Sequence, residues 1–143
     1  MKELYFTDEN LKSVSSNIIK EISKYQRNKR IPFFPQKSAL LILDMQDFFL
    51  NHQSHAFIPS APVIVGNIKS LLTAYLNNNY PVIFTRHSNT SRNAKMMKKW
   101  WGRLINSEQK ESEIIDSLYT ADSKIITKTQ YEAFYNTELY DYL

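Results

Sequence analysis

Ala39-Leu40-Leu41-Ile42-Leu43-Asp44 is the stretch that decides the fold, because it is a continuous apolar run closed by one carboxylate. A run of this kind predicts a strand covered on both faces, as in a parallel sheet between helices. Lys124-Ile125-Ile126-Thr127 predicts another strand, which is followed by Lys128. Open α/β sheets bind their ligands at the carboxyl ends of parallel strands. We therefore predict that Asp44 and Lys128 face a single pocket.

The rest of the chain predicts helices and strands in alternation. An apolar stripe predicts a first helix at residues 11–25, and two prolines, Pro32 and Pro35, then favour an extended connection. Pro62 begins a helix whose inward face carries Val65, Ile68, Leu72 and Leu76 and which ends at Asn77-Asn78-Asn79. The remaining predicted elements are a strand at Val82–Thr85 and two helices, at Met96–Leu104 and Glu108–Tyr119. This order predicts an α/β fold with a parallel sheet and right-handed crossovers, a Rossmann-like arrangement of three layers.

Composition excludes several classes of protein. The chain has 143 residues, of which 43% are apolar, and it is long enough to form one globular domain. It has no cysteine, so we expect no disulfide and no thiol chemistry within these residues. Its two glycines, Gly66 and Gly102, exclude a glycine-rich nucleotide loop, and no cofactor is expected. No apolar run approaches the roughly 20 residues that span a bilayer, so we expect a cytoplasmic protein without a membrane partner.

The net charge of +4 raises the question of nucleic-acid binding. The basic residues fall in two separate groups: Lys24, Arg27, Lys29 and Arg30, and Lys95, Lys98, Lys99 and Arg103. Because they do not form one stripe, the excess is more typical of a solvated surface that attracts an anionic small molecule. We expect a small-molecule substrate and no nucleic-acid partner.

Four blocks of sequence together resemble a known family. They are Leu43-Asp44-Met45-Gln46-Asp47-Phe48-Phe49, Phe84-Thr85-Arg86-His87, Trp101-Gly102, and Lys128-Thr129-Gln130-Tyr131-Glu132-Ala133-Phe134. In order and spacing they resemble the isochorismatase-like hydrolases, also called the cysteine hydrolase superfamily. The resemblance runs from about Pro35 to the C-terminus. It implies an N-terminal helix and extended lead at residues 1–34 and the first part of a hydrolase domain at residues 35–143.

The resemblance also implies roles for individual residues. It makes Asp44 and Lys128 catalytic, and it assigns substrate binding to Gln46, Phe49, His87, Trp101 and Tyr131. Each has a plainer interpretation, since a strand-end Asp often caps a turn and aromatic residues are often core. His87 departs from the isochorismatases, which often carry Gln at this place, so the substrate stays open.

We expect no metal site. His52, His55 and His87 are the only histidines, and no acidic or cysteine partner follows them in a metal-binding pattern. Nicotinamidases of this superfamily carry an acidic residue and two histidines around the second strand. Thr85-Arg86-His87-Ser88-Asn89 lacks that arrangement.

Three functions are compatible with these residues. In the isochorismatase type, Asp44 is a general acid that protonates a vinyl ether, and no thiol is required. In the amidase type, Asp44 and Lys128 activate a cysteine nucleophile, which this chain lacks. The third is a non-catalytic remnant or binding module. The sequence Asp-Met-Gln-Asp-Phe-Phe and the Trp-Gly block look more like the isochorismatase type, which we favour. This resemblance implies a role in secondary metabolism such as siderophore biosynthesis.

The last residues predict the start of a helix, with Thr137 as its N-cap and Leu139, Tyr142 and Leu143 as its apolar stripe. The family's cysteine position falls on a later strand. We therefore expect a fold truncated after its third strand, with the first strand left as an apolar edge. Such a chain should be nearly inactive alone, and its open edge should favour self-association into a homo-oligomer.

Overall fold

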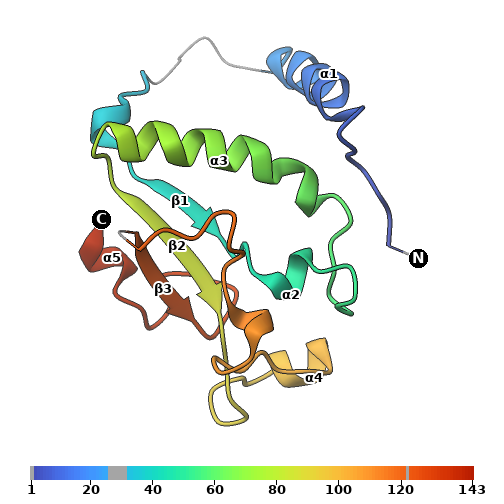
Figure 1. Cartoon of the computed structure of the whole chain (residues 1–143), viewed down its shortest axis with the longest axis vertical. Helices are drawn as coiled ribbons and strands as arrows, with labels where there is room; N and C mark the ends of the chain where they lie inside the picture. Colours follow the sequence, from blue (N-terminus) through green and yellow to red (C-terminus); the bar gives the residue numbers. More distant parts are fainter. Residues whose placement is uncertain (1, 26–31, 122) are drawn as a thin grey trace.

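Three parallel strands form one sheet, in the order β1 (Leu40–Leu43), β2 (Val82–His87) and β3 (Lys124–Lys128) (Figure 1). The computed structural model describes residues 2–25, 32–121 and 123–143. Leu40 of β1 is in register with Val82, and His87 at the end of β2 is in register with Lys128. All three predicted strands are confirmed, and β2 runs two residues further than its apolar run predicts.

The predicted helices have mixed outcomes. The helices α1 (Leu11–Ser23) and α3 (Ala61–Asn77) are confirmed, and α2 (Asp47–Leu50) follows β1 as one short turn. The helix predicted at residues 96–104 is only α4 (Met97–Trp101), because Gly102 adopts the left-handed conformation (φ 67°) that ends a helix. The last helix is α5 (Leu139–Tyr142), and Thr137 lies one position before its observed N-cap.

The helix predicted at residues 108–119 is wrong. This segment holds a 3₁₀ turn, η2 (Lys110–Ser112), followed by Ile114, which forms an isolated bridge with Gln46, and by a turn at residues 116–118. The backbone of Glu113 accepts a hydrogen bond from Asp47 N at 3.0 Å, and Ile115 N donates to Met45 O at 3.0 Å. These backbone groups pair with the chain after β1, so they are not available to a helix.

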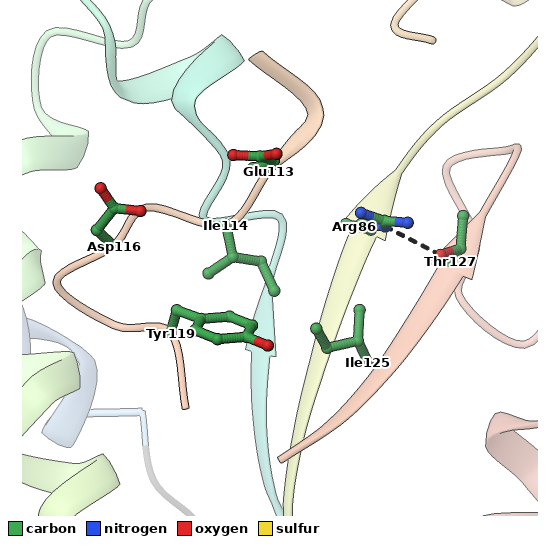
Figure 2. Close-up of a pocket in the computed structure, with 7 residues that line it drawn as sticks. All are labelled: Arg86, Glu113, Ile114, Asp116, Tyr119, Ile125 and Thr127. Atoms are coloured by element: carbon green, nitrogen blue, oxygen red, sulfur yellow. Dashed lines mark hydrogen bonds between the residues drawn. The ribbon is translucent and has the colours of Figure 1, made fainter. Parts of the chain in front are cut away.

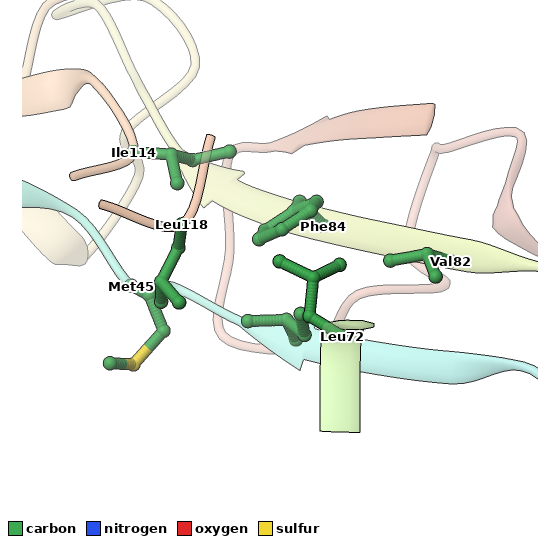
Figure 3. Close-up of a cluster of buried hydrophobic side chains, with 7 residues drawn as sticks. Met45, Leu72, Val82, Phe84, Ile114 and Leu118 are labelled. Atoms are coloured by element: carbon green, nitrogen blue, oxygen red, sulfur yellow. The ribbon is translucent and has the colours of Figure 1, made fainter. Parts of the chain in front are cut away.

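The main core lies between α3 and one face of the sheet. Leu72 of α3 belongs to a buried cluster with residues of β1, of β2 and of the loops that follow β1 and η2: Ile42, Met45, Val82, Phe84, Ile114 and Leu118 (Figure 3). The predicted inward face of α3 is confirmed, since Val65, Ile68 and Leu76 pack against the same cluster. Burying an apolar side chain of this size stabilises the fold by about 1.5–3 kcal/mol. This core fixes β1 and β2, and with them the strand ends that carry the site.

The opposite face of the sheet has a smaller cover. Ile83, Ile126 and Leu139 form its buried cluster, with Ala39, Leu41 and Ala133 packed around them. Leu139 belongs to the single turn of α5, so this layer is thin compared with α3. The sheet therefore lies between two unequal layers, as the predicted three-layer fold requires.

The N-terminal helix stands apart from both cores. None of the described side chains of α1 is buried, and Ile19 and Ile22 are 64% and 56% exposed. Figure 1 shows α1 beyond α3, away from the sheet. The basic residues Arg27, Lys29 and Arg30 lie outside the described residues. In the predicted extended connection, residues 32–34 form neither helix nor strand, and a 3₁₀ turn, η1 (Pro35–Lys37), follows them. Within the described ranges, no helix is both long and apolar enough to cross a membrane.

The outer edge of β1 generates a first prediction. In the part of the chain that the structure describes, β1 pairs only with β2, and Leu43 at its end is 56% exposed. An apolar strand edge favours pairing between copies, and lysine opposes it. We expect the protein to elute above its monomer mass of 16.9 kDa in size-exclusion chromatography with light scattering, and Leu43→Lys to lower the observed mass.

Leu71→Lys is the matched control, because Leu71 is 52% exposed on α3, away from the strand edge. It should leave the observed mass unchanged. A monomeric parent protein, or an equal effect of the two substitutions, would contradict an interface at the β1 edge.

Candidate active site

Asp44 and Lys128 meet across the end of β2, and the predicted proximity of these two groups is confirmed. Lys128 Nζ lies 2.7 Å from Asp44 Oδ2. The hydroxyl of Thr85, from the strand between them, donates to the other carboxylate oxygen of Asp44 at 2.7 Å. One carboxylate therefore receives an ammonium on one oxygen and a hydroxyl on the other, which fixes its orientation.

The backbone of Asp44 is bent to bring its side chain to this place. Asp44 has a φ of 51°, in the left-handed region that few residues other than glycine adopt. Its N–H donates to Thr85 O at 3.1 Å, and its carbonyl accepts from Gln46 N at 2.7 Å. Asp tolerates this conformation better than most residues, at a cost of about 1–3 kcal/mol that recurs at functional sites. The bend turns the chain from β1 into α2.

Lys128 is the more buried member of the pair. Its side chain is 5% exposed, against 28% for Asp44. An ammonium group taken out of water needs a charged or hydrogen-bonding partner, and Asp44 supplies the charge. The carbonyls of Gln130 and Tyr131 lie 3.4 Å from the same nitrogen. Because Asp44 is the more exposed partner, the open side of the pair is its carboxylate.

The pair lies at one end of a cavity of about 490 Å³. Three aromatic residues, Phe49, Trp101 and Tyr131, contribute to its wall, and Tyr131 accepts a hydrogen bond from Trp101 Nε1 at 2.6 Å. The remaining lining is largely apolar: Phe6, Leu43, Met45, Leu50, Ile58, Ser60, Ala61 and Ile64. The cavity thus suits a small molecule with one charged end and an apolar body.

Five of the seven predicted site residues line this cavity, and Gln46 and His87 do not. Gln46 is fully buried behind it. Its Oε1 accepts from His87 N at 2.7 Å, and its Nε2 donates to His87 O at 2.9 Å and to Ser112 O at 2.7 Å. The amide joins the end of β2 to the segment at residue 112, so the geometry gives it a structural task.

His87 lies behind the wall of the cavity as well. It is fully buried, and its ring centroid is 4.8 Å from that of Trp101. Its Nε2 pairs with the Asn89 amide nitrogen at 3.0 Å. Burial, and after it the charge of Lys128, lower the pKa of His87 to about 4, although the Asp44 carboxylate opposes this shift. His87 is therefore a neutral support for Trp101 at neutral pH.

A second cavity of about 460 Å³ lies on the other face of the sheet. Figure 2 shows Arg86 and Thr127 on its strand side, joined by a hydrogen bond of 3.1 Å, with Glu113, Asp116 and Tyr119 on the loop side. Arg86 and Thr127 follow Thr85 and precede Lys128 by one residue, and successive strand residues face opposite ways. This cavity contains none of the predicted site residues, so the candidate active site is the one beside Asp44.

With this geometry, comparison with known proteins identifies the family. A family model described as the isochorismatase domain matches residues 38–143, which is well over half of the chain. The chain belongs to the isochorismatase domain family. The resemblance inferred from the four sequence blocks is thereby confirmed.

Relatives of this isochorismatase-family chain include enterobactin synthase component B of Escherichia coli (strain K12), 28% identical over 110 residues, which are 75% of this chain and 38% of that protein. The isochorismatase of Bacillus subtilis (strain 168) is 31% identical over 111 residues, which are 73% of this chain and 34% of that protein. A solved cysteine hydrolase from Pseudomonas syringae pv. phaseolicola 1448A superposes with a TM-score of 0.76 at 26% identity, covering 82% of this chain and 59% of that one. The predicted α/β fold is thus confirmed, and the chain spans well under half the length of the two named relatives.

Among the residues of this isochorismatase-family site that sequence reasoning missed, Thr85 and Phe6 are the most informative. Thr85 belongs to the block Phe84-Thr85-Arg86-His87. It precedes His87 by two residues, so the two side chains share one face of the strand end, and this was the available signal. Phe6 carried no signal, because it lies in the predicted lead, far in sequence from Asp44. Only the fold brings it to the cavity.

The buried amide of Gln46 gives a prediction on stability. Gln46→Ala leaves three buried backbone groups, of His87 and Ser112, without their partner. We expect it to lower the free energy of unfolding by about 3 kcal/mol, since each unpaired buried group costs about 1–3 kcal/mol. Urea denaturation measures this. Exposed Gln53→Ala is the control, and equal losses for the two variants would contradict the structural task of Gln46.

His87 gives a prediction on pH. Its folded-state pKa is about 4, below the ordinary value of 6.5, so the unfolded chain binds more protons between these values. Stability contributed by neutral His87 is therefore complete above pH 6.5 and is lost as the pH falls towards 4. His87→Gln should flatten the pH dependence of the unfolding free energy in this window, by up to about 1.4 kcal/mol per pH unit. Exposed His52→Gln should leave the slope as in the parent, and an unchanged slope in His87→Gln would contradict the buried neutral form.

Proposed function

We propose that this chain carries the acid of an isochorismatase-type active site and acts on the vinyl ether of isochorismate or a related small molecule. One observation supports the proposal above all. Asp44, oriented by Thr85 and paired with Lys128 at 2.7 Å, opens into an apolar and aromatic cavity. A positioned acid beside a binding cavity is the minimum that hydrolysis of a vinyl ether requires.

The proposed reaction starts with transfer of the Asp44 proton to the terminal methylene carbon of the vinyl ether. The ether oxygen stabilises the resulting oxocarbenium ion. Water adds to the cationic carbon and gives a hemiketal, which collapses to pyruvate and the ring alcohol. Asp44 regains a proton from the added water. No thiol takes part, which agrees with a sequence that has no cysteine.

The charge state of Asp44 depends on what occupies the cavity. In the described structure, Lys128 and Thr85 both stabilise the carboxylate form, whereas an acid must carry a proton. Isochorismate is a dianion, and a substrate carboxylate beside Lys128 competes with Asp44 for the ammonium. The added negative charge also favours a neutral Asp44. In this proposal, Asp44 takes up a proton from solvent when the substrate binds and then donates it to the vinyl ether.

The remaining site residues receive supporting roles in this proposal. Trp101 and Tyr131, joined by their hydrogen bond, and Phe49 provide faces for the ring of the substrate. Gln46 and His87 act from behind this wall by holding the end of β2 and the ring of Trp101. Similarity to a protein named enterobactin synthase component B supports siderophore biosynthesis as the metabolic setting.

The described residues also support low turnover by these 143 residues alone. Leu43, beside Asp44 in the cavity wall, is 56% exposed, so one side of the site admits water. Water at the open side weakens the electrostatic effect of Lys128 on the substrate and on Asp44.

A second candidate is the amidase type. A carboxylate already paired with Lys128 is in the form that accepts a proton from a thiol, and the Pseudomonas syringae structure bears the name cysteine hydrolase. Its nucleophile has to come from outside this sequence, which has no cysteine. Release of pyruvate from isochorismate with the parent chain alone separates the two candidates, because the amidase type gives none. If the folded protein binds isochorismate but releases no pyruvate from it, the result favours a binding module.

Asp44→Asn tests the proposed acid. We expect it to lower the rate of pyruvate release from isochorismate by about 10² or more, because a positioned general acid contributes about 10²–10⁴ in rate. The rate is followed with lactate dehydrogenase and NADH at a protein concentration that makes slow parent turnover measurable. Circular dichroism and the melting temperature report whether the variant keeps the fold.

Asp47→Asn is the matched control. Asp47 lies three residues further on, in α2, and is absent from the cavity lining. This variant should retain the parent rate. A folded Asp44→Asn protein that releases pyruvate as fast as the parent would remove Asp44 from the mechanism.

A further inference from the structure

The first residues of the chain cross onto the segment that precedes α3. Lys2 Nζ donates to the carbonyls of His55 and Phe57, at 2.7 Å each. The N–H groups of Tyr5 and Phe6 both donate to Ser60 Oγ at 3.0 Å. We call residues 2–7 the strap. These four bonds join parts of the chain that are more than 50 positions apart in the sequence and lie outside any sheet or helix ladder.

The strap turns one side chain inward. Leu4 and Tyr5 are 53% and 64% exposed, whereas Phe6 is half-buried and lines the cavity of Asp44 and Lys128. Tyr5 instead points its hydroxyl to Glu3, at 2.6 Å. The inward position of Phe6 therefore reflects the fixed backbone of the strap, because Ser60 holds the N–H of Phe6 itself.

Phe6 completes the apolar part of the cavity. It lines the cavity together with Ile58, at the end of the loop, and with Ile64 of α3, while Asp44 and Lys128 supply the charged part. A ligand whose charged group meets Lys128 has an apolar body to place against this wall. An aromatic ring at such a place contributes contact area and discriminates against polar bodies.

We propose that the strap delivers Phe6 as a substrate-contacting specificity residue, which selects small cyclic anions with an apolar face. The identity of the ligand rests on the proposed function, whereas the position of Phe6 does not. The bonds of the strap lie at the surface, where water competes with them, so the strap can open to admit a ligand and close against it.

Binding of isochorismate in the Asp44→Asn background tests the contact without turnover. Isothermal titration calorimetry gives the affinity. Phe6→Ala should weaken binding by about tenfold, and Tyr5→Ala, which removes the neighbouring ring that faces solvent, should stay within about twofold. If the Phe6 and Tyr5 variants bind isochorismate equally well, Phe6 is no specificity residue.

A measurement without ligand tests the wall itself. Trp101 lines the same cavity, and Trp100→Phe makes it the only tryptophan of the chain. Acrylamide should then quench the fluorescence of Trp101 more strongly after Phe6→Ala, or after Ser60→Ala, which removes the acceptor of the strap. Tyr5→Ala should leave quenching unchanged. Quenching that does not respond to Phe6→Ala overturns the proposal that the strap closes the cavity.

The two measurements separate failure of this inference from failure of the proposed function. If isochorismate does not bind to the folded Asp44→Asn protein, the proposed substrate is wrong, and quenching alone decides the place of Phe6. If isochorismate binds and Phe6→Ala changes neither measurement, the proposed function stands and the inference about Phe6 falls.

Discussion

The ion pair between Asp44 and Lys128 is the constraint on which the rest of the site depends. The Lys128 side chain is only 5% exposed, and an ammonium group so far removed from water is unstable in a protein unless a charge or several dipoles surround it. The partner comes from β1, two strands away from β3, so both side chains have to reach over the end of β2. That requirement explains why Thr85 carries a hydroxyl at a fully buried position and why Asp44 adopts a left-handed backbone. Without the other two, the buried ammonium, the buried hydroxyl and the left-handed backbone would each lower the stability of the fold.

The two faces of the sheet divide the work of folding and of binding. Packing of α3 against the sheet forms the larger of the two buried clusters, and only Met45 and Leu50 belong both to this core and to the lining of the cavity. The side that carries Thr85, His87 and Lys128 has a thinner cover and holds the ion pair of Asp44 and Lys128. Hydrogen bonds pair the Thr85 hydroxyl with Asp44 and the Gln46 amide with the backbone of His87, whereas Nδ1 of buried His87 has no hydrogen-bond partner among the described residues. We expect changes in the main core to alter stability more than chemistry, and changes beyond the strand ends to do the reverse.

The sequence alone predicted the elements whose signals are local. Apolar runs marked the three strands, and the meeting of Asp44 with Lys128 followed from the geometry of parallel strand ends. The segment at residues 108–119 was beyond such reasoning, because its apolar spacing fits a helix while its backbone pairs with residues 45–47. Phe6 was missed for a related reason: nothing near it in sequence reveals the distant Ser60 that fixes it. Gln46 was predicted to bind the substrate, because pattern alone could not tell a buried amide from one that faces a ligand.

The side-chain amide of Gln46 takes the place of a backbone peptide group beside the end of β2. Its oxygen accepts the N–H of His87 and its nitrogen donates to the carbonyl of the same residue. The backbone groups of His87 are thereby paired at the point where the backbone of Asp44 turns away from β2. In a third bond, the same side-chain nitrogen donates to the carbonyl of Ser112, which connects Gln46 to the segment at residue 112. The chain thus leaves the sheet at the bend of Asp44 while Gln46 stays bonded to the end of β2, so the bend and the residues behind Trp101 are held by the same side chain.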